Sequence, residues 1–158
     1  MDELLPVLER EGITLCVEPH PEYWIEQLQP AVDIVQNIGS KALRLSYTPP
    51  HTRYYGDDMA AMLREAAPLP AHTRVADTFD HKKSSQLRYN VNLPGPSQVR
   101  VHQHPNMGQG EIDWNLFFQT LGKVGFNGVV SASVFAREER AKDSSRFMRG
   151  EMQRYIAR

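Results

Sequence analysis

The feature that most constrains this chain is an alternation of short apolar runs with segments whose apolar residues recur at helical spacing. Four runs have the length and composition of strands: 13–18 (ITLCVE), 42–47 (ALRLSY), 71–77 (AHTRVAD) and 128–135 (GVVSASVF). Around them, helices are predicted at 4–10, 21–38, 58–67, 114–123 and 138–156. Strands that alternate with helices predict an α/β fold of about four parallel strands with crossover helices.

Four such strand–helix units amount to half of a (β/α)8 barrel, whose usual size is ~250 residues. The chain has 158 residues, of which 41% are hydrophobic and 23% charged, and this composition suits one globular domain. We therefore expect residues 1–158 to form a single domain, a partial barrel. The segment 79–100, rich in Pro, Gly, Ser and Asn, is longer than most loops, and such loops are usually functional or disordered.

The nearly equal numbers of basic and acidic residues limit the kind of partner that the chain is expected to bind. There are 18 Lys and Arg against 19 Asp and Glu, so we expect neither nucleic acid nor an anionic membrane as a partner. No apolar run approaches the ~20 residues of a membrane helix. The single cysteine, Cys16, excludes an internal disulfide and favours a cytoplasmic location. A small molecule or another protein is the expected partner.

Strand alternation places polar side chains on one face of the predicted sheet. That face carries Glu18, Arg44, Ser46, Thr48, His72, Arg74, Ser131 and Ser133. A parallel sheet that is buried on both faces reads as nearly continuous apolar sequence, and buried polar groups without partners are costly. We expect this face to surround a wet or liganded interior, as in a barrel. The alternative is an ordinary sheet with one solvated face.

Two histidines give the strongest local signal for a metal. His102 and His104 are two residues apart, so on an extended segment both rings lie on the same side and can converge on one ion. The alternative is a pair of exposed loop histidines.

Three further residues follow the predicted strands, where barrels place catalytic groups. Glu18 ends the first strand and could be a metal ligand, a general base or one half of a salt bridge. His51 follows two prolines, so its loop is stiff and its position is well defined. Asp77 ends the third strand and could bind a ligand hydroxyl or a metal-bound water, or could cap the loop.

Several stretches together resemble a known family. They are VEPHPEYW, SYTPPHTRYYGDDM, RVADTFDHKKSSQLRY, VHQHPNMGQGEIDW and SSRFMRGEMQRY. The chain resembles the sugar phosphate isomerase/epimerase-like proteins, the xylose isomerase-like TIM barrels that also include the endonuclease IV group. Within these it is most similar to the IolH-type proteins of inositol catabolism. The resemblance covers nearly the whole chain but only the C-terminal half of the family's barrel, about its last four strands.

The resemblance implies a divalent metal site. The metal glutamate of the family falls on Glu18, and the histidine that follows the next strand falls on His51. The loop histidines of the endonuclease IV group fall on His102 and His104. These four mixed N and O ligands would suit Zn, Mn or Co.

Three positions depart from that pattern. Thr48 stands where the family has an aspartate, Arg74 where it has a histidine, and Ser133 where it has a glutamate. The departures put the usual metal site of the isomerases in question.

The resemblance implies a metal-assisted isomerase or epimerase that acts on a cyclitol or keto sugar in inositol catabolism. Glu18 and Asp77 would be catalytic, and Arg44, His72 and Arg74 would hold the substrate. The alternative is a non-catalytic half-barrel that has lost metal ligands and binds a sugar-like ligand or a partner subunit. A third possibility, a phosphodiesterase of the endonuclease IV type, is disfavoured by the lack of a basic surface.

A half-barrel would expose two sheet edges, which invites pairing with another chain. We therefore expect a homodimer, or a missing N-terminal half that completes the barrel.

Overall fold

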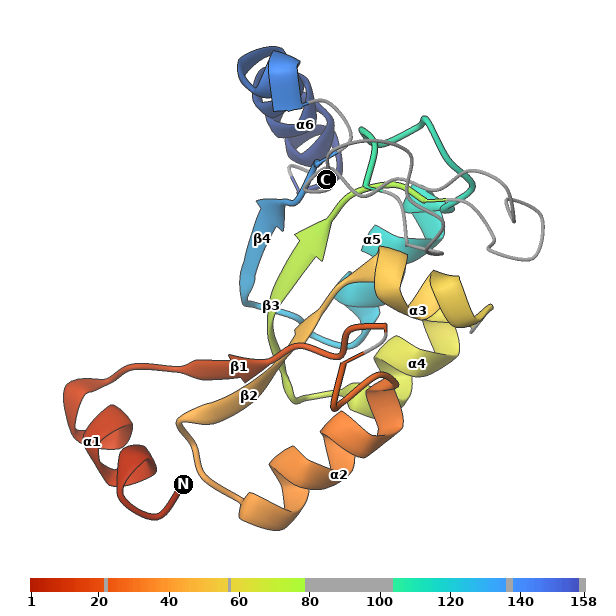
Figure 1. The fold of residues 1–158 in the computed structure, drawn as a ribbon. Coiled ribbons are helices and arrows are strands. Elements are labelled where there is room, and N and C mark those ends of the chain that lie inside the picture. Colours follow the sequence, from red (N-terminus) through yellow and green to blue (C-terminus); the bar gives the residue numbers. More distant parts are fainter. Residues whose placement is uncertain (22, 57, 79–103, 136–137, 157–158) are drawn as a thin grey trace.

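The computed structural model describes residues 1–21, 23–56, 58–78, 104–135 and 138–156. They contain a four-stranded sheet in the order β1-β2-β3-β4, and every neighbouring pair is parallel (Figure 1). The strands are β1 (Leu15–Val17), β2 (Leu43–Tyr47), β3 (Pro70–Val75) and β4 (Val129–Ala132). Sequential parallel strands with helices between them are the repeating unit of a (β/α)8 barrel, so the predicted fold class is confirmed.

The helices lie mainly on one side of this sheet. They are α1 (Leu4–Glu11), α2 (Leu28–Ile38), α3 (Pro49–Tyr55), α4 (Met59–Ala66), α5 (Trp114–Lys123) and α6 (Ala141–Ile156), the last preceded by a short 3-10 turn, η1 (Glu138–Arg140). In Figure 1, α2, α4 and α5 lie along the same face of the sheet, and α6 lies beyond the end of β4. Among the described residues no helix is both long enough and apolar enough to cross a membrane.

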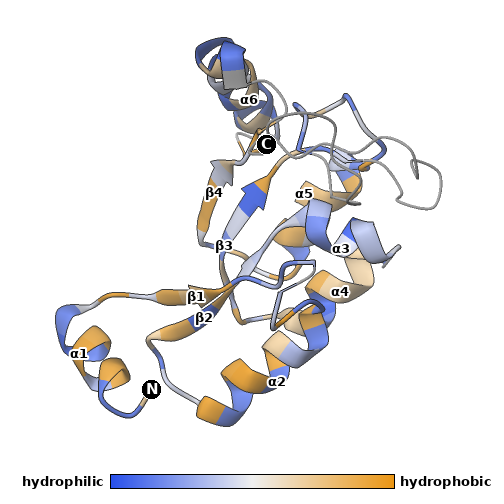
Figure 2. Cartoon of the chain, viewed as in Figure 1, coloured by the Kyte–Doolittle hydropathy of each residue, from blue (hydrophilic) through white to orange (hydrophobic). Residues whose placement is uncertain are grey.

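The core forms between that face and the helices. Its fully buried members include Leu45 and Tyr47 of β2, Val75 of β3, Leu63 of α4 and Phe117 of α5. Hydrophobic and hydrophilic residues alternate along α2 and α4, as expected of helices with one buried face (Figure 2). The opposite face of the sheet carries the polar side chains that strand alternation predicts, including Arg44, His72 and Arg74.

Capping residues mark four of the helix ends. Gly12 and Gly39 end α1 and α2 in the left-handed conformation, with φ of 66° and 68°, which glycine adopts without steric cost. Asp58 accepts hydrogen bonds from two backbone N–H groups of the first turn of α4. Asp113 accepts one from the first turn of α5.

Two local predictions are wrong. The helix expected at 21–38 begins only at Leu28, shortly before Pro30, and Trp24, inside the expected range, is fully exposed. Proline is tolerated in the first turn of a helix, so Pro30 marks its beginning. The segment after β2, expected to be a stiff loop, is helix α3, because its two prolines occupy the first turn and preset φ for it.

The predicted long loop at 79–100 lies outside the described residues.

Candidate functional site

A charged pair joins the carboxyl ends of β1 and β3. Glu18 directly follows β1, and Arg74 is the penultimate residue of β3. Arg74 Nη1 donates a hydrogen bond of 2.8 Å to Glu18 Oε2. The side chains are 21% and 34% exposed, so the pair is partly sheltered yet open to small solutes.

Two hydroxyl groups extend this pair across all four strands. Thr48, which directly follows β2, donates from Oγ1 to Glu18 Oε1 at 2.7 Å. Ser133, which directly follows β4, accepts at Oγ from Arg74 Nη2 at 3.0 Å. The chain of hydrogen bonds therefore runs from Thr48 through Glu18 and Arg74 to Ser133, with one member in or directly after each strand.

Histidines border the pair on one side. The ring centroids of His51 and His104 are 5.4 Å apart, and those of His51 and His20 are 4.5 Å apart. His51 Nδ1 lies 3.5 Å from Glu18 Oε1. His51 and His104 are buried, each 3% exposed. The site thus combines one carboxylate, one guanidinium and three imidazoles in a small region.

The backbone fixes the tautomer of the two buried histidines. His51 Nδ1 lies 2.7 Å from the Pro19 carbonyl oxygen, and His104 Nδ1 lies 2.7 Å from that of Ser133. A carbonyl oxygen only accepts, so Nδ1 carries the proton in each ring. Burial, with a smaller contribution from the nearby Arg74 cation, lowers the pKa of His104 to about 4 against the hydrogen bond to Ser133. His104 is therefore neutral at pH 7.

Arg74 is held by a third contact besides its two hydrogen bonds. Its guanidinium carbon lies 5.9 Å from the centre of the Phe135 ring, a cation–π distance. The Phe135 ring in turn lies 4.8 Å from the His104 ring. These contacts set the direction of the guanidinium.

Three residues predicted for the site have their described contacts elsewhere. Asp77 is fully buried and accepts hydrogen bonds from the backbone N–H groups of Thr78, Gly108 and Ile112 and from Trp114 Nε1. It ties the loop before α5 to the end of β3, which matches the loop-capping alternative. His72 lies on the polar face, two residues before Arg74, and its Nε2 is 2.8 Å from Ser131 Oγ.

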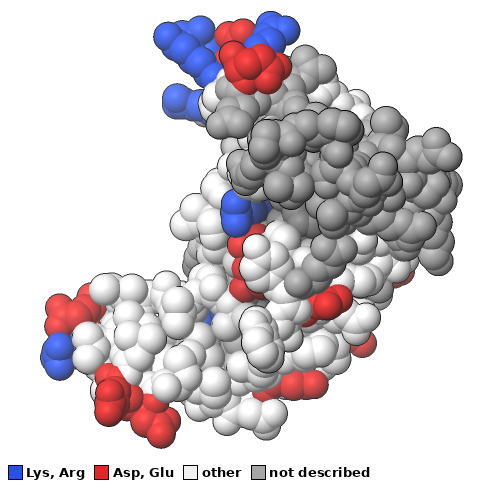
Figure 3. Space-filling model, viewed as in Figure 1, with Lys and Arg blue, Asp and Glu red and all other residues white. Residues whose placement is uncertain are grey.

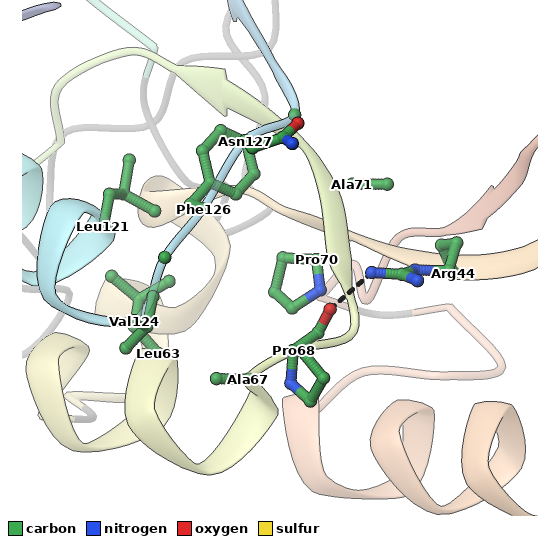
Figure 4. Close-up of a pocket in the computed structure, with 12 residues that line it drawn as sticks. Arg44, Leu63, Ala67, Pro68, Pro70, Ala71, Leu121, Val124, Phe126 and Asn127 are labelled. Carbon is green, nitrogen blue, oxygen red and sulfur yellow. Dashed lines mark hydrogen bonds between the residues drawn. The ribbon is translucent and has the colours of Figure 1, made fainter.

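Arg44 lies at the opposite end of the sheet from Glu18. It is the second residue of β2, and its guanidinium donates to the carbonyl oxygens of Leu69 and Pro68, before β3 begins. Figure 4 shows the side chain reaching the Pro68 oxygen beside a cavity of about 370 Å³ at the amino ends of β3 and β4. Barrels place their chemistry at the other end, so we do not assign the site to this cavity.

Two residues of the network were not predicted as site residues. Thr48 and Ser133 were assigned to the polar face and to positions where the resemblance implies a lost metal ligand, although each directly follows a strand and so reaches its carboxyl end. The neighbour of His51, His20, could have been inferred from its position two residues after Glu18. His102 lies outside the described residues, so its predicted convergence with His104 stays a prediction.

The fold and the site together define a class of protein, a half of a parallel α/β barrel with a polar site at the carboxyl ends of its strands. More narrowly, the chain belongs to the xylose isomerase-like TIM barrel family, whose model matches residues 1–151.

Solved structures support the same fold. The IolI protein with a bound zinc atom is 20% identical, with a TM-score of 0.74 over 98% of this chain and 53% of that chain. The 3-keto-D-glucoside 4-epimerase YcjR from E. coli is 22% identical, with a TM-score of 0.68 over 94% of this chain and 50% of that chain. An L-ribulose 3-epimerase is 14% identical, with a TM-score of 0.70 over 98% and 51%.

The chain spans about half the length of these solved structures. At such identities the likeness shows the fold alone. Among curated protein sequences, none matches the chain. The IolH-type detail of the resemblance stays a prediction.

The described residues do not fit the divalent metal that the resemblance implies. Within the described parts of the chain, no three His, Cys, Asp or Glu side chains are placed to hold an ion together. A metal on Glu18 would lie about 2.1 Å from a carboxylate oxygen. Oε2 accepts a hydrogen bond from the Arg74 cation and Oε1 accepts one from Thr48, so an ion on Glu18 would lie beside a guanidinium that repels it.

Proposed function

We propose that this chain supplies the C-terminal half of a sugar isomerase or epimerase site, for a keto sugar or cyclitol of the kind processed in inositol breakdown. The Glu18–Arg74 pair at the carboxyl ends of parallel strands carries the proposal, because barrels place their reacting groups there. Membership of the xylose isomerase-like family supports it. So do the epimerase names of similar structures, although they share only the fold.

In the proposed reaction Glu18 moves the proton. Its carboxylate removes the proton from the carbon beside the sugar carbonyl and forms an O–H bond. The electron pair of the broken C–H bond becomes a C=C bond, and the carbonyl π pair moves to oxygen, which gives an enediolate. Return of a proton to the other face of the same carbon, as the enediolate oxygen re-forms the C=O bond, gives the epimer. For the isomer, the hydroxyl proton of the deprotonated carbon first moves to the former carbonyl oxygen. The carbon proton then returns to the former carbonyl carbon as the new C=O bond forms on the neighbouring carbon.

The second candidate is a non-catalytic half-barrel that binds a sugar-like ligand. The hydrogen bonds of Glu18 favour it, because Thr48 and Arg74 already donate to both carboxylate oxygens. Catalysis would require a proton to reach a carboxylate whose two oxygens already accept hydrogen bonds. A binding protein needs no proton transfer, since carboxylate and guanidinium groups can hold sugar hydroxyls directly.

Hydrogen exchange in D2O separates the two candidates. Wild-type chain is incubated with D-fructose or with 2-keto-myo-inositol, and loss of the proton signal beside the carbonyl is followed by NMR. Exchange that disappears in Glu18→Gln supports the enzyme. The matched control is Arg154→Ala, which removes another 2.8 Å arginine–glutamate pair, Arg154 with Glu151 on α6, and should leave exchange intact. Saturable sugar binding without exchange would contradict catalysis and support the second candidate.

We further propose that another half-barrel completes the fold, either a second copy of this chain or an N-terminal half. Within the described sheet, β1 and β4 each pair with one strand only. Large apolar side chains are exposed near both edges: Ile13 and Leu15 at β1, and Val129, Phe147 and Ile156 near β4 and on α6. Apolar groups gathered at open sheet edges favour association.

Light scattering on the purified chain tests this partner. A dimer, or a monomer that becomes a one-to-one complex when an N-terminal half is added, would support it. A monomer that stays monomeric and binds no such half would contradict it.

The surface charge gives no support to a nucleic-acid partner. Figure 3 shows charges of both signs together over α6 and near α1 on the face shown, rather than a basic surface.

A further inference from the structure

The positions that depart from the family pattern are bonded to one another in this structure. Thr48, Arg74 and Ser133 are the three departures, and each is a member of the hydrogen-bond chain that includes Glu18. With Glu18, these residues lie in or directly after four separate strands, yet they meet at hydrogen-bond distances of 2.7, 2.8 and 3.0 Å. The replacements therefore form one connected arrangement rather than three isolated losses.

The arrangement supplies Glu18 with a positive charge of its own. A guanidinium stays protonated at any pH at which proteins are folded, so Arg74 is a permanent cation beside the carboxylate. Ser133 and the Phe135 ring hold it from two other sides. A divalent ion at the same place would meet repulsion from this cation and would find hydroxyl groups, at Thr48 and Ser133, that are weak ligands for Zn2+.

Toward the described residues, the guanidinium leaves donors available for a ligand. It has five N–H groups, and its described hydrogen bonds use one on Nη1 and one on Nη2. The side chain is 34% exposed, so these donors can be reached from the polar face. Hydrogen bonds from a guanidinium to oxygen are charge-assisted and strengthen when the oxygen becomes negative.

We propose that Arg74 takes the place of the divalent metal, so that the site binds the carbonyl or hydroxyl oxygens of a polyhydroxylated ligand through a fixed guanidinium and without a metal ion. The ligand class in this statement rests on the proposed function. The independence from metal rests only on the contacts of Glu18, Thr48, Arg74 and Ser133.

Zinc titration in competition with a chromophoric chelator tests, without any sugar, the proposal that the site binds no metal ion (the metal statement). The full wild-type chain is compared with Arg74→Ala and with the triple variant Thr48→Asp, Arg74→His, Ser133→Glu, which restores metal-ligating side chains at the three positions. Wild type should take up no stoichiometric Zn2+, and the triple variant should take up one ion per chain. Circular dichroism establishes that each variant is folded.

Stoichiometric Zn2+ on wild type that is lost in Glu18→Gln would overturn the proposal. If the triple variant does not fold, wild type and Arg74→Ala still decide. Wild type without zinc and Arg74→Ala with a gain in zinc affinity support the role of the guanidinium, whereas equal zinc binding by both contradicts it.

A separate calorimetric titration with D-fructose or myo-inositol keeps this proposal distinct from the proposed function. Sugar binding that appears only after Zn2+ is added would overturn the metal statement and leave the function standing. Absence of both zinc and sugar binding would remove the function while the metal statement stands. Sugar binding in the presence of EDTA that is lost in Arg74→Ala and kept in Arg154→Ala supports both.

Discussion

Asp77 is expected to stabilise the fold rather than to react with substrate, and substitution can measure this. Its side chain is 0% exposed, and its two oxygens accept four hydrogen bonds, three from backbone N–H groups and one from the Trp114 ring. The donors come from the end of β3, from the loop before α5 and from α5 itself. Removal of the carboxylate leaves all of them without this acceptor.

The size of the effect follows from those donors. A buried N–H that loses its partner costs about 1–3 kcal/mol. Water can reach the exposed Gly108 and the half-buried Ile112 more easily than the buried Thr78 and Trp114. With two donors fully affected and two partly relieved, Asp77→Ala should lower the free energy of unfolding by about 3–5 kcal/mol. That is a large share of the ~5–15 kcal/mol that stabilises a typical domain.

Two variants make the comparison specific. Asp77→Asn keeps the shape but turns an NH2 group toward donors, because Oδ2 accepts from both Gly108 N and Trp114 Nε1. It should also destabilise. Asp58→Ala is the matched control, since Asp58 accepts two backbone N–H groups at the exposed beginning of α4 and should cost only about 1 kcal/mol.

The assay is urea unfolding followed by circular dichroism at one protein concentration, with midpoints converted through a shared slope. Equal losses for Asp77→Ala and Asp58→Ala would refute the reasoning. An Asp77→Asn chain that keeps wild-type stability but no longer catalyses deuterium exchange beside the sugar carbonyl would instead support the catalytic role predicted from the sequence.

Three other substitutions have expected outcomes. Gly110→Ala should unfold at lower urea, because a Cβ there would lie 2.3 Å from the Thr78 carbonyl oxygen and 2.4 Å from Asp77 Oδ1; a wild-type midpoint would contradict this packing. In the folded chain the pKa of His104 is lowered to about 4 from the ordinary 6.5, so the unfolded chain binds the proton more readily. The stability that neutral His104 contributes is therefore complete above pH 6.5 and is lost as pH falls to 4. Over that range the free energy of unfolding should fall by about 3 kcal/mol more for wild type than for His104→Gln. Parallel pH profiles of the two unfolding free energies would refute this expectation. Trp24→Ser should change stability by less than about 0.5 kcal/mol, since the side chain is fully exposed, and a larger loss in the same urea assay would show that Trp24 packs.

The sequence predicts the fold well because two periodicities mark it. Apolar alternation locates the four strands, and glycine and aspartate mark the helix ends at Gly12, Gly39, Asp58 and Asp113. The errors lie at prolines. Pro30 shortens α2 and the two prolines of α3 begin a helix, because proline disrupts a helix interior but favours its first turn.

The site is predicted less completely. Alternation shows which face of the sheet a side chain lies on, but not whether the side chain reaches groups at the amino end or at the carboxyl end of the strands. Arg44 and Arg74 lie on the same polar face, yet Arg44 donates to carbonyls at the amino end and only Arg74 reaches Glu18. Three of the four donors to Asp77 come from residues more than thirty positions later in the chain, and only the folded structure brings them together. Strand-end position predicts the location of Glu18, which directly follows β1 and has His51 beside it, while the roles of both residues stay predictions.

The most direct test of the account is calorimetric titration of the full wild-type chain with D-fructose and with myo-inositol in the presence of EDTA. The account predicts saturable binding under these metal-free conditions, lost in Arg74→Ala and retained in Arg154→Ala. Binding that requires added Zn2+, or that survives loss of the Arg74 guanidinium, would contradict it.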